Sequence, residues 1–135
     1  MIELINTAVQ TVAVGQAVVY NAVAVHSGFA ERHRQGSAQI TLTKPGRYLV
    51  TFSGNIAVPT GGTVGEISLG IAQDGEILGG SVMRVTPAAV EEYFNVSTQH
   101  YVDTYCGCCV NIAVENTSDQ PILVDNPNVV AVRVC

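Results

Sequence analysis

The chain carries little charge for its length. Asp, Glu, Lys and Arg make up only 13% of its 135 residues, about half the share in an average soluble domain. Because a soluble monomer normally covers its surface with charge, we expect this chain to hide neutral or apolar surface by self-association. The net charge of −5 argues against nucleic-acid binding, which needs a basic surface.

Signals for membrane insertion or secretion are also missing. No run of about eighteen apolar residues is present, so we expect no transmembrane helix and no membrane insertion. Residues 1–10 lack the basic start and the long apolar stretch of a secretory signal. Without a linker, a low-complexity tract or a fixed-period repeat, residues 1–135 are predicted to form a single domain with its own core.

What the chain does contain is a series of short stretches in which apolar and polar residues alternate, as is typical of half-buried strands. The pattern is clearest over residues 39–85, where the breaks contain Gly, Pro or Asp-Gly. These residues suit chain reversals. Asp74-Gly75 is the strongest hairpin prediction, because a two-residue type I′ turn needs a positive φ at both positions.

These stretches predict an all-β protein of eight to ten antiparallel strands, arranged as a sandwich, jelly roll or barrel. Residues 26–38 are predicted to be a long exposed loop, and residues 86–91 a turn or a single helical turn. The final run, 129–134, is apolar on both faces and should lie inside a sheet or at a subunit interface. The candidate strands are residues 3–9, 11–14, 17–25, 39–43, 47–58, 66–72, 77–85, 92–104, 110–116, 122–126 and 129–134.

The order of these phrases resembles the jelly rolls of the tumour necrosis factor family and of complement-type globular heads. Residues 45–48 match that family's turn into a strand, Asp74-Gly75 its central hairpin, and the C-terminal run its last strand near the trimer axis. Within that group, the phrases NIAVPTGGTVGEISL and VTPAAVEEYFNV resemble short proteins encoded by bacteriophages and prophages of gut Firmicutes.

The resemblance implies a homotrimeric β module used for display, attachment or capping, without an active site. The chain has no collagen-like stalk, which favours a virion component made in the host cytoplasm over a protein anchored to a cell surface. We therefore expect a non-enzymatic structural or attachment module of a phage particle: a capsid decoration, a head fibre or a tail component. Its partners would be copies of itself and other virion proteins or a host-surface receptor.

A carbohydrate- or receptor-binding lectin-like module, on a virion or on a bacterial surface, is the alternative function. Jelly rolls often bind sugars through aromatic and acidic loop residues, but this chain has no Trp. The loops at 26–38 and 58–66 are expected to face outward and to contact a partner. The candidate contact residues are His26, Phe29, Arg32, His33, Arg34, Thr60 and Thr63.

Four cysteines form the sharpest local anomaly: Cys106, Cys108 and Cys109 are clustered, and Cys135 ends the sequence. Their spacing lacks the paired C-x-x-C arrangement of structural zinc sites. Two alternatives stay open. The thiols form disulfides, including an intermolecular bond through Cys135, or they are small buried hydrophobic side chains.

No other pattern predicts chemistry. The three histidines have no metal-site spacing, and Glu91-Glu92 are neighbours that would point to opposite faces of an extended segment. Residues 61–65 are Gly-rich but precede a strand pattern and lack a lysine, unlike a phosphate-binding loop. We therefore predict no catalytic residue, no metal and no cofactor.

Overall fold

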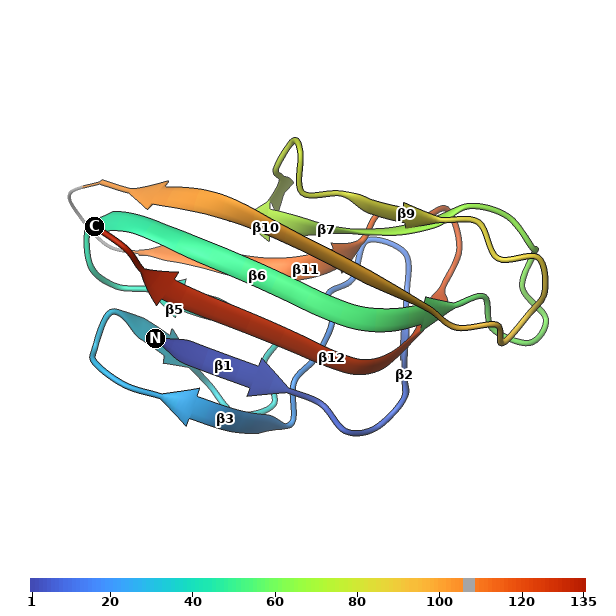
Figure 1. The fold of residues 1–135 in the computed structure, drawn as a ribbon, viewed down its shortest axis with the longest axis horizontal. Coiled ribbons are helices and arrows are strands. Elements are labelled where there is room, and N and C mark those ends of the chain that lie inside the picture. The colour runs from blue at the N-terminus through green and yellow to red at the C-terminus, as the bar shows by residue number, and fades with distance from the viewer. Residues whose placement is uncertain (106–108) are drawn as a thin grey trace.

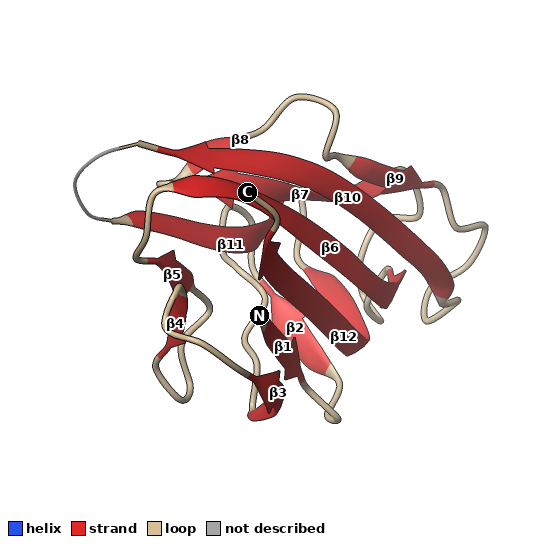
Figure 2. Cartoon of the chain, turned by 60° about the vertical axis from the view of Figure 1, so that its left-hand side comes forward, coloured by secondary structure: helices blue, strands red, loops and turns tan. Residues whose placement is uncertain are grey.

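The computed structural model describes residues 1–105 and 109–135, and this part of the chain contains twelve strands and no helix. The strands form two antiparallel sheets that pack face to face (Figures 1 and 2). The predicted all-β sandwich is therefore confirmed, with more and shorter strands than the predicted eight to ten. No helix in the described ranges is long and apolar enough to cross a membrane.

The first sheet, here called sheet A, has the strand order β10-β6-β12-β1-β3, and β2 pairs with β12 off this path. Its two long central strands run side by side across the molecule in Figure 1. As predicted, the C-terminal run lies inside a sheet, because β12 is flanked by β6 and β1. The bounds are β1 Ile2–Ile5, β2 Gln10–Val12, β3 Ala22–His26, β6 Gly46–Ala57, β10 Phe94–Thr104 and β12 Ile122–Arg133.

The second sheet, sheet B, has the order β4-β5-β11-β7-β8, and β9 pairs with β7. It lies behind sheet A in the view of Figure 1. The bounds are β4 Glu31–His33, β5 Ile40–Leu42, β7 Ile67–Gln73, β8 Glu76–Ile77, β9 Met83–Val85 and β11 Val110–Asn116.

The core lies between the two sheets and is built by strand alternation. In β6, every second side chain is buried, including Tyr48, Val50 and Phe52, which are fully shielded from solvent. They belong to the same cluster as Ile71 of β7 and Ile112 of β11 in the opposite sheet. Because alternate residues of a strand point to opposite faces, the intervening residues of β6 must face away from the core.

The hairpin prediction at Asp74-Gly75 is confirmed. Gln73 of β7 pairs with Glu76 of β8, so the turn has two residues. Asp74 has a φ of 52° and Gly75 a φ of 86°, as a type I′ turn requires. The Asp74 carboxylate also accepts a hydrogen bond of 2.9 Å from the backbone N–H of Asn111, which fixes the turn against β11.

Two predictions of where strands are interrupted were wrong. Residues 77–85 are not one strand, because Gly80, with a φ of 87°, allows an arch between β8 and β9. Conversely, 122–133 is one strand rather than two, and the predicted turn is a bulge between Asp125 and Asn128. The residue at the bulge is Asn126, with a φ of 52°; a left-handed residue there bends the strand without ending it.

The prediction that residues 26–38 form one long exposed loop was also wrong. Residues 31–33 form β4, which pairs with β5, and Glu31 is buried. Residues 86–91 contain no helical turn, so the turn alternative holds there. Val23 and Val25 of β3 are 47% and 41% exposed; they lie on the edge strand of sheet A and not in the core.

Candidate functional site

Part of the outward face of sheet A carries no charged side chain, as the alternation of its strands arranges it. Leu49 of β6 lies between Val132 of β12 and Tyr101 of β10. One step along, Thr51 lies between Val130 and Gln99. We call these six residues the uncharged face. Tyr101 is 59% exposed, and the three aliphatic side chains are partly exposed, so this face meets solvent in the single chain.

Charged groups at the end of this face neutralise each other. Arg47 donates hydrogen bonds of 2.7 and 3.0 Å to the two carboxylate oxygens of Asp103, and its guanidinium lies 5.9 Å from the ring centroid of Tyr101. The hydrogen bonds and the positive charge of Arg47 hold the pKa of Asp103 below its usual value. The pair is exposed, so it ends the uncharged face with no net charge.

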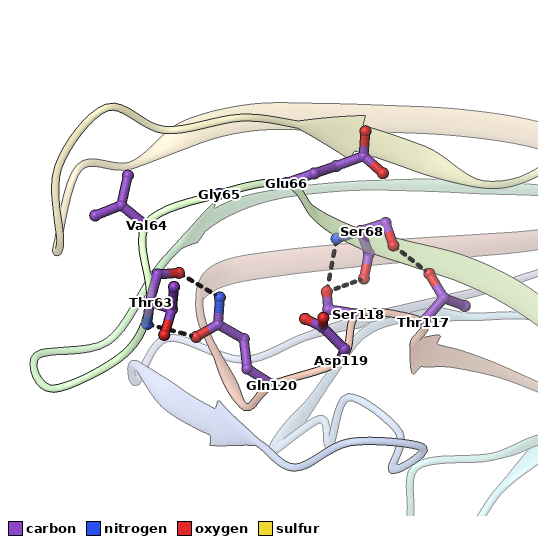
Figure 3. Close-up of a pocket in the computed structure, with 9 residues that line it drawn as sticks. All are labelled: Thr63, Val64, Gly65, Glu66, Ser68, Thr117, Ser118, Asp119 and Gln120. Atoms are coloured by element: carbon purple, nitrogen blue, oxygen red, sulfur yellow. Dashed lines mark hydrogen bonds between the residues drawn. The ribbon is translucent and has the colours of Figure 1, made fainter.

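A polar notch lies at the end of the sandwich remote from the chain termini, between the loop 58–66 and the turn 117–120 (Figures 1 and 3). Its volume is about 550 Å³. The backbone N–H of Thr63 donates to Gln120 Oε1 at 2.9 Å, and Gln120 Nε2 donates to the Thr63 carbonyl at 2.6 Å. The hydroxyls of Ser68 and Thr117 are 2.6 Å apart. Because these polar groups are hydrogen-bonded to one another, they fix the loop 58–66 to the turn 117–120.

The remaining acidic side chains of the notch do not build a cation site. Glu66 is paired with Arg84 at 3.6 Å, and Asp119 stands apart from it in Figure 3. In the described ranges, no three His, Cys, Asp or Glu side chains are grouped as metal ligands. The geometry therefore offers no multidentate oxygen site of the kind that calcium requires.

A second concavity, here called the basic cleft, lies between the β3–β4 connection and the residues that follow β5, near the N- and C-termini in Figure 1. Its volume is about 380 Å³. It is less polar than the notch, because an aromatic ring and aliphatic stems form much of its wall. The side chains that matter here are His26, Phe29, Glu31, Arg32, Thr43 and Lys44.

The buried carboxylate of Glu31 anchors this cleft. Glu31 Oε2 accepts a hydrogen bond of 2.8 Å from the ammonium of Met1, and its side chain is 0% exposed. Its other oxygen, Oε1, is buried and receives no hydrogen bond from any described residue. His26 Nε2 lies 2.9 Å from the Glu31 carbonyl oxygen, so the end of β3 is tied to the start of β4.

The predicted contact residues divide between two ends of the molecule. The basic cleft brings together His26, Phe29 and Arg32, whereas Thr63 lies in the polar notch with its backbone held by Gln120. His33 lies at the end of β4 and contacts the Gln39 carbonyl oxygen through Nδ1 at 3.0 Å. Their role in partner contact remains a prediction.

The two remaining predicted residues, Arg34 and Thr60, lie outside both cavities. Arg34 follows β4, and Thr60 is exposed in the loop 58–66. Sequence reasoning missed Lys44 and Glu31. The only usable signal was that Lys44 is the single lysine and precedes Pro45-Gly46.

The cysteine alternatives also remain predictions. Cys106 and Cys108 lie outside the described residues, and Cys109 is disulfide-bonded. Cys135 is an exposed free thiol. It lies beside Gly46, where an added Cβ would contact the Cys135 carbonyl oxygen. Because Cys135 is exposed, it is not a buried thiol, and the intermolecular bond through it stays a prediction.

No protein-family model and no curated protein sequence matches this chain. Solved structures do. The globular domain of zebrafish complement 1qA protein has a TM-score of 0.76 at 12% identity, covering 99% of this chain and 96% of that chain. The Eiger TNF of S. frugiperda has a TM-score of 0.67 at 10% identity, covering 99% and 92%. The vertex protein P5 of the phage PRD1 has a TM-score of 0.55 at 15% identity, covering 99% and 96%.

The fold is a jelly roll of the complement-head and tumour necrosis factor type. At these identities the likeness extends to the fold alone. The jelly roll places two sheets back to back and leaves the outer face of each sheet to solvent or to a partner. What this chain does with its fold must be argued from its own surfaces.

Proposed function

We propose that this protein is a non-enzymatic structural or attachment module of a bacteriophage particle and that it acts as a homotrimer. The particle component would be a capsid decoration, a head fibre or a tail part, assembled from chains made in the host cytoplasm. The observation that carries the proposal is the uncharged face of sheet A. It lies on the three longest strands of the sheet, β6, β10 and β12, and on a monomer it would be left exposed to solvent.

The shape of this surface favours a ring of copies. A sheet face that meets a different part of the next copy makes a heterologous contact, and such contacts close into rings when the rotation allows it. The edge strand β10 offers such a different part, because Phe94, which does not belong to the uncharged face, is 38% exposed on it. Each apolar Å² buried in this way contributes roughly 25 cal/mol, and stable interfaces bury about 800 Å² per partner.

The phage setting is supported by two observations together. The phrases at residues 55–69 and 85–96 resemble short phage and prophage proteins, although no curated sequence matches the chain. A phage vertex protein shares the fold. Neither concerns an active site, and the polar groups of the larger notch bond to one another instead of being poised for reaction. A host-surface receptor or another virion protein would then contact the loops at the two ends of the sandwich.

Light scattering coupled to size exclusion tests the assembly. At micromolar concentration we expect the mass of three chains, independent of dilution over about a tenfold range, as expected for a tightly held interface. A stable monomer would contradict the proposed homotrimer. Antibody labelling of purified particles tests the setting: label at regular positions supports a virion component, and absence from particles of the producing phage contradicts it.

A lectin-like role is the second candidate, and one observation favours it. Phe29 is 84% exposed at the rim of the basic cleft, so its ring is available to a ligand there. An exposed ring beside polar groups is a common element of ligand recognition. This role is compatible with a homotrimer, because attachment modules present binding sites on an assembled scaffold.

A further inference from the structure

The basic cleft brings together two of the four Lys and Arg side chains that form no salt bridge within the described residues. The chain has six Lys and Arg residues and a net charge of −5, yet Arg32 and Lys44 both line this one concavity. Neither forms a salt bridge within residues 1–105 and 109–135. In contrast, Arg47 and Arg84 are paired with carboxylates. Two unpaired cations beside one cavity attract an anionic group.

The backbone on both sides of the cleft is held rigidly. Thr43 donates from Oγ1 to the Phe29 carbonyl at 2.7 Å and from its backbone N–H to the Ala30 carbonyl at 2.8 Å. On the other side, the Lys44 carbonyl accepts from the Tyr48 hydroxyl at 2.7 Å and from Thr104 Oγ1 at 2.8 Å. The positions from which Phe29 and Lys44 project are thus fixed before any ligand arrives, which reduces the entropy lost on binding.

The composition of the wall selects the kind of anion. Phe29 offers an exposed apolar ring, while Lys44 and Arg32 offer charged donors. The buried Glu31 Oε1 receives no hydrogen bond from the described residues, so a hydroxyl donor in the cleft suits it. A ligand that satisfies all three has a ring with an apolar face, a carboxylate and hydroxyl groups. The volume of about 380 Å³ is at the small end of ligand sites and suits a sugar unit better than a folded partner.

We propose that the basic cleft binds a carboxylate-bearing sugar unit, of the uronic acid type, in a surface polysaccharide. The ring stacks on Phe29, and the carboxylate accepts hydrogen bonds from Lys44 and Arg32. This inference gives the attachment role of the proposed function a ligand class. The cleft lies within one chain, so binding does not require the trimer.

The test is a calorimetric titration of the full chain with glucuronate, with glucose as the matched neutral sugar and with a short oligoglutamate peptide as the matched non-sugar anion. We expect glucuronate to bind with a dissociation constant of about 1 mM and more weakly at high salt. Glucose and the peptide should each bind at least about tenfold more weakly. Equal binding of glucose, tighter binding of the peptide, or no heat from glucuronate up to about 20 mM would overturn the proposal.

Variants locate the site. Lys44→Gln and Phe29→Ala should each weaken glucuronate binding at least about fivefold, because one removes the charge and the other the stacking ring. The matched controls are Arg84→Gln, which removes a cation remote from the cleft, and Phe94→Ala, which removes an exposed ring of β10. Controls that weaken binding equally, or cleft variants that bind like wild type, would refute the assignment.

The same samples separate this proposal from the assembly. Light scattering reports the mass of each variant, and circular dichroism reports its fold. If glucuronate fails to bind to a chain that still has the mass of three copies, the cleft proposal fails alone. If the chain is monomeric and glucuronate binds as expected, the homotrimer fails and the cleft proposal stands.

Discussion

The two sheets share one core but treat their outer faces in opposite ways. Sheet B covers itself: the outward positions of β7 are small, and Ile77 and Val82 of the β8–β9 arch lie over Gly70. Outside this cover, the outward face of sheet B carries polar side chains. On β5 and β11, for example, the Thr41 hydroxyl donates a hydrogen bond of 2.8 Å to Asn111 Oδ1. Sheet A has no such cover over its uncharged face. One face is completed by its own chain, whereas the other is the face that the proposed homotrimer would cover.

A charge placed on the uncharged face should have the largest effect, because it should prevent assembly of the proposed homotrimer. In Val130→Lys, the new ammonium lies opposite Glu3 of β1, so the single chain tolerates it. Within an interface, however, it costs several kcal/mol to desolvate. We expect light scattering to report the mass of one chain, with an unchanged circular dichroism spectrum.

The control for that variant is Thr41→Lys on the outer face of sheet B. It adds the same charge to a strand of the same fold and should leave the assembly intact. If both variants dissociate equally, the two faces do not differ in their role in assembly, and general charge repulsion explains the loss of the oligomer.

A cavity in the shared core should destabilise both sheets together. Phe52 is fully buried between them, so Phe52→Ala removes packing that both sheets use and should cost about 3–5 kcal/mol. Urea denaturation at fixed protein concentration measures the loss. Phe29→Ala, at an 84% exposed position outside the proposed subunit contact, is the matched control and should cost much less; a similar cost at both positions would contradict the core assignment.

Crowding the covered face should give an intermediate effect. An added Cβ at Gly70 would lie 3.1 Å from Ile77 Cγ2 and 3.3 Å from Val82 Cγ2, so Gly70→Val must displace the arch. We expect a loss of about 1–3 kcal/mol in thermal unfolding, with the assembly retained at low temperature. Gly65→Val, where nothing lies within 4 Å, is the control. An unchanged melting temperature for Gly70→Val would show that the arch does not cover sheet B.

The smallest effect should come from the ion pair that ends the uncharged face. The Arg47 hydrogen bonds lower the pKa of Asp103 in the folded state, so the pair contributes stability above the ordinary pKa of Asp, about 3.9. That contribution is lost as the pH falls below about 4. Wild type should therefore lose slightly more stability than Asp103→Asn between pH 5 and about pH 3. Parallel pH profiles would show that the exposed pair contributes nothing.

Much of the architecture was predictable because strands and turns have local signatures. The period-two alternation of β11 located its bounds at Val110–Asn116, and Asp74-Gly75 marked the hairpin. The arch after β8 and the bulge in β12 were not predictable in the same way. Pairing with β6 continues β12 through its bulge, and β9 pairs with β7 only after the arch. The pattern of residues within one segment does not show which strand that segment will pair with.

The candidate sites were less predictable than the fold. Phe29 and Arg32 were recognised as outward residues, but their partner in the basic cleft is Lys44, which the pairing of β4 with β5 brings alongside. Glu31 lies between two predicted loop residues and is nevertheless buried. Its carboxylate is paired with the Met1 ammonium 2.8 Å away, a contact between residues 30 positions apart in the sequence.

The amino-acid sequence by itself determined that this protein is all β, because alternation and turn chemistry act over a few residues at a time. It also determined that charge is too scarce to cover the surface. Only the tertiary structure decided where that scarcity falls. Strand pairing places uncharged side chains of β6, β10 and β12 together on one face and two unpaired cations beside an exposed ring, since residues distant in sequence become neighbours only once the sheets have formed.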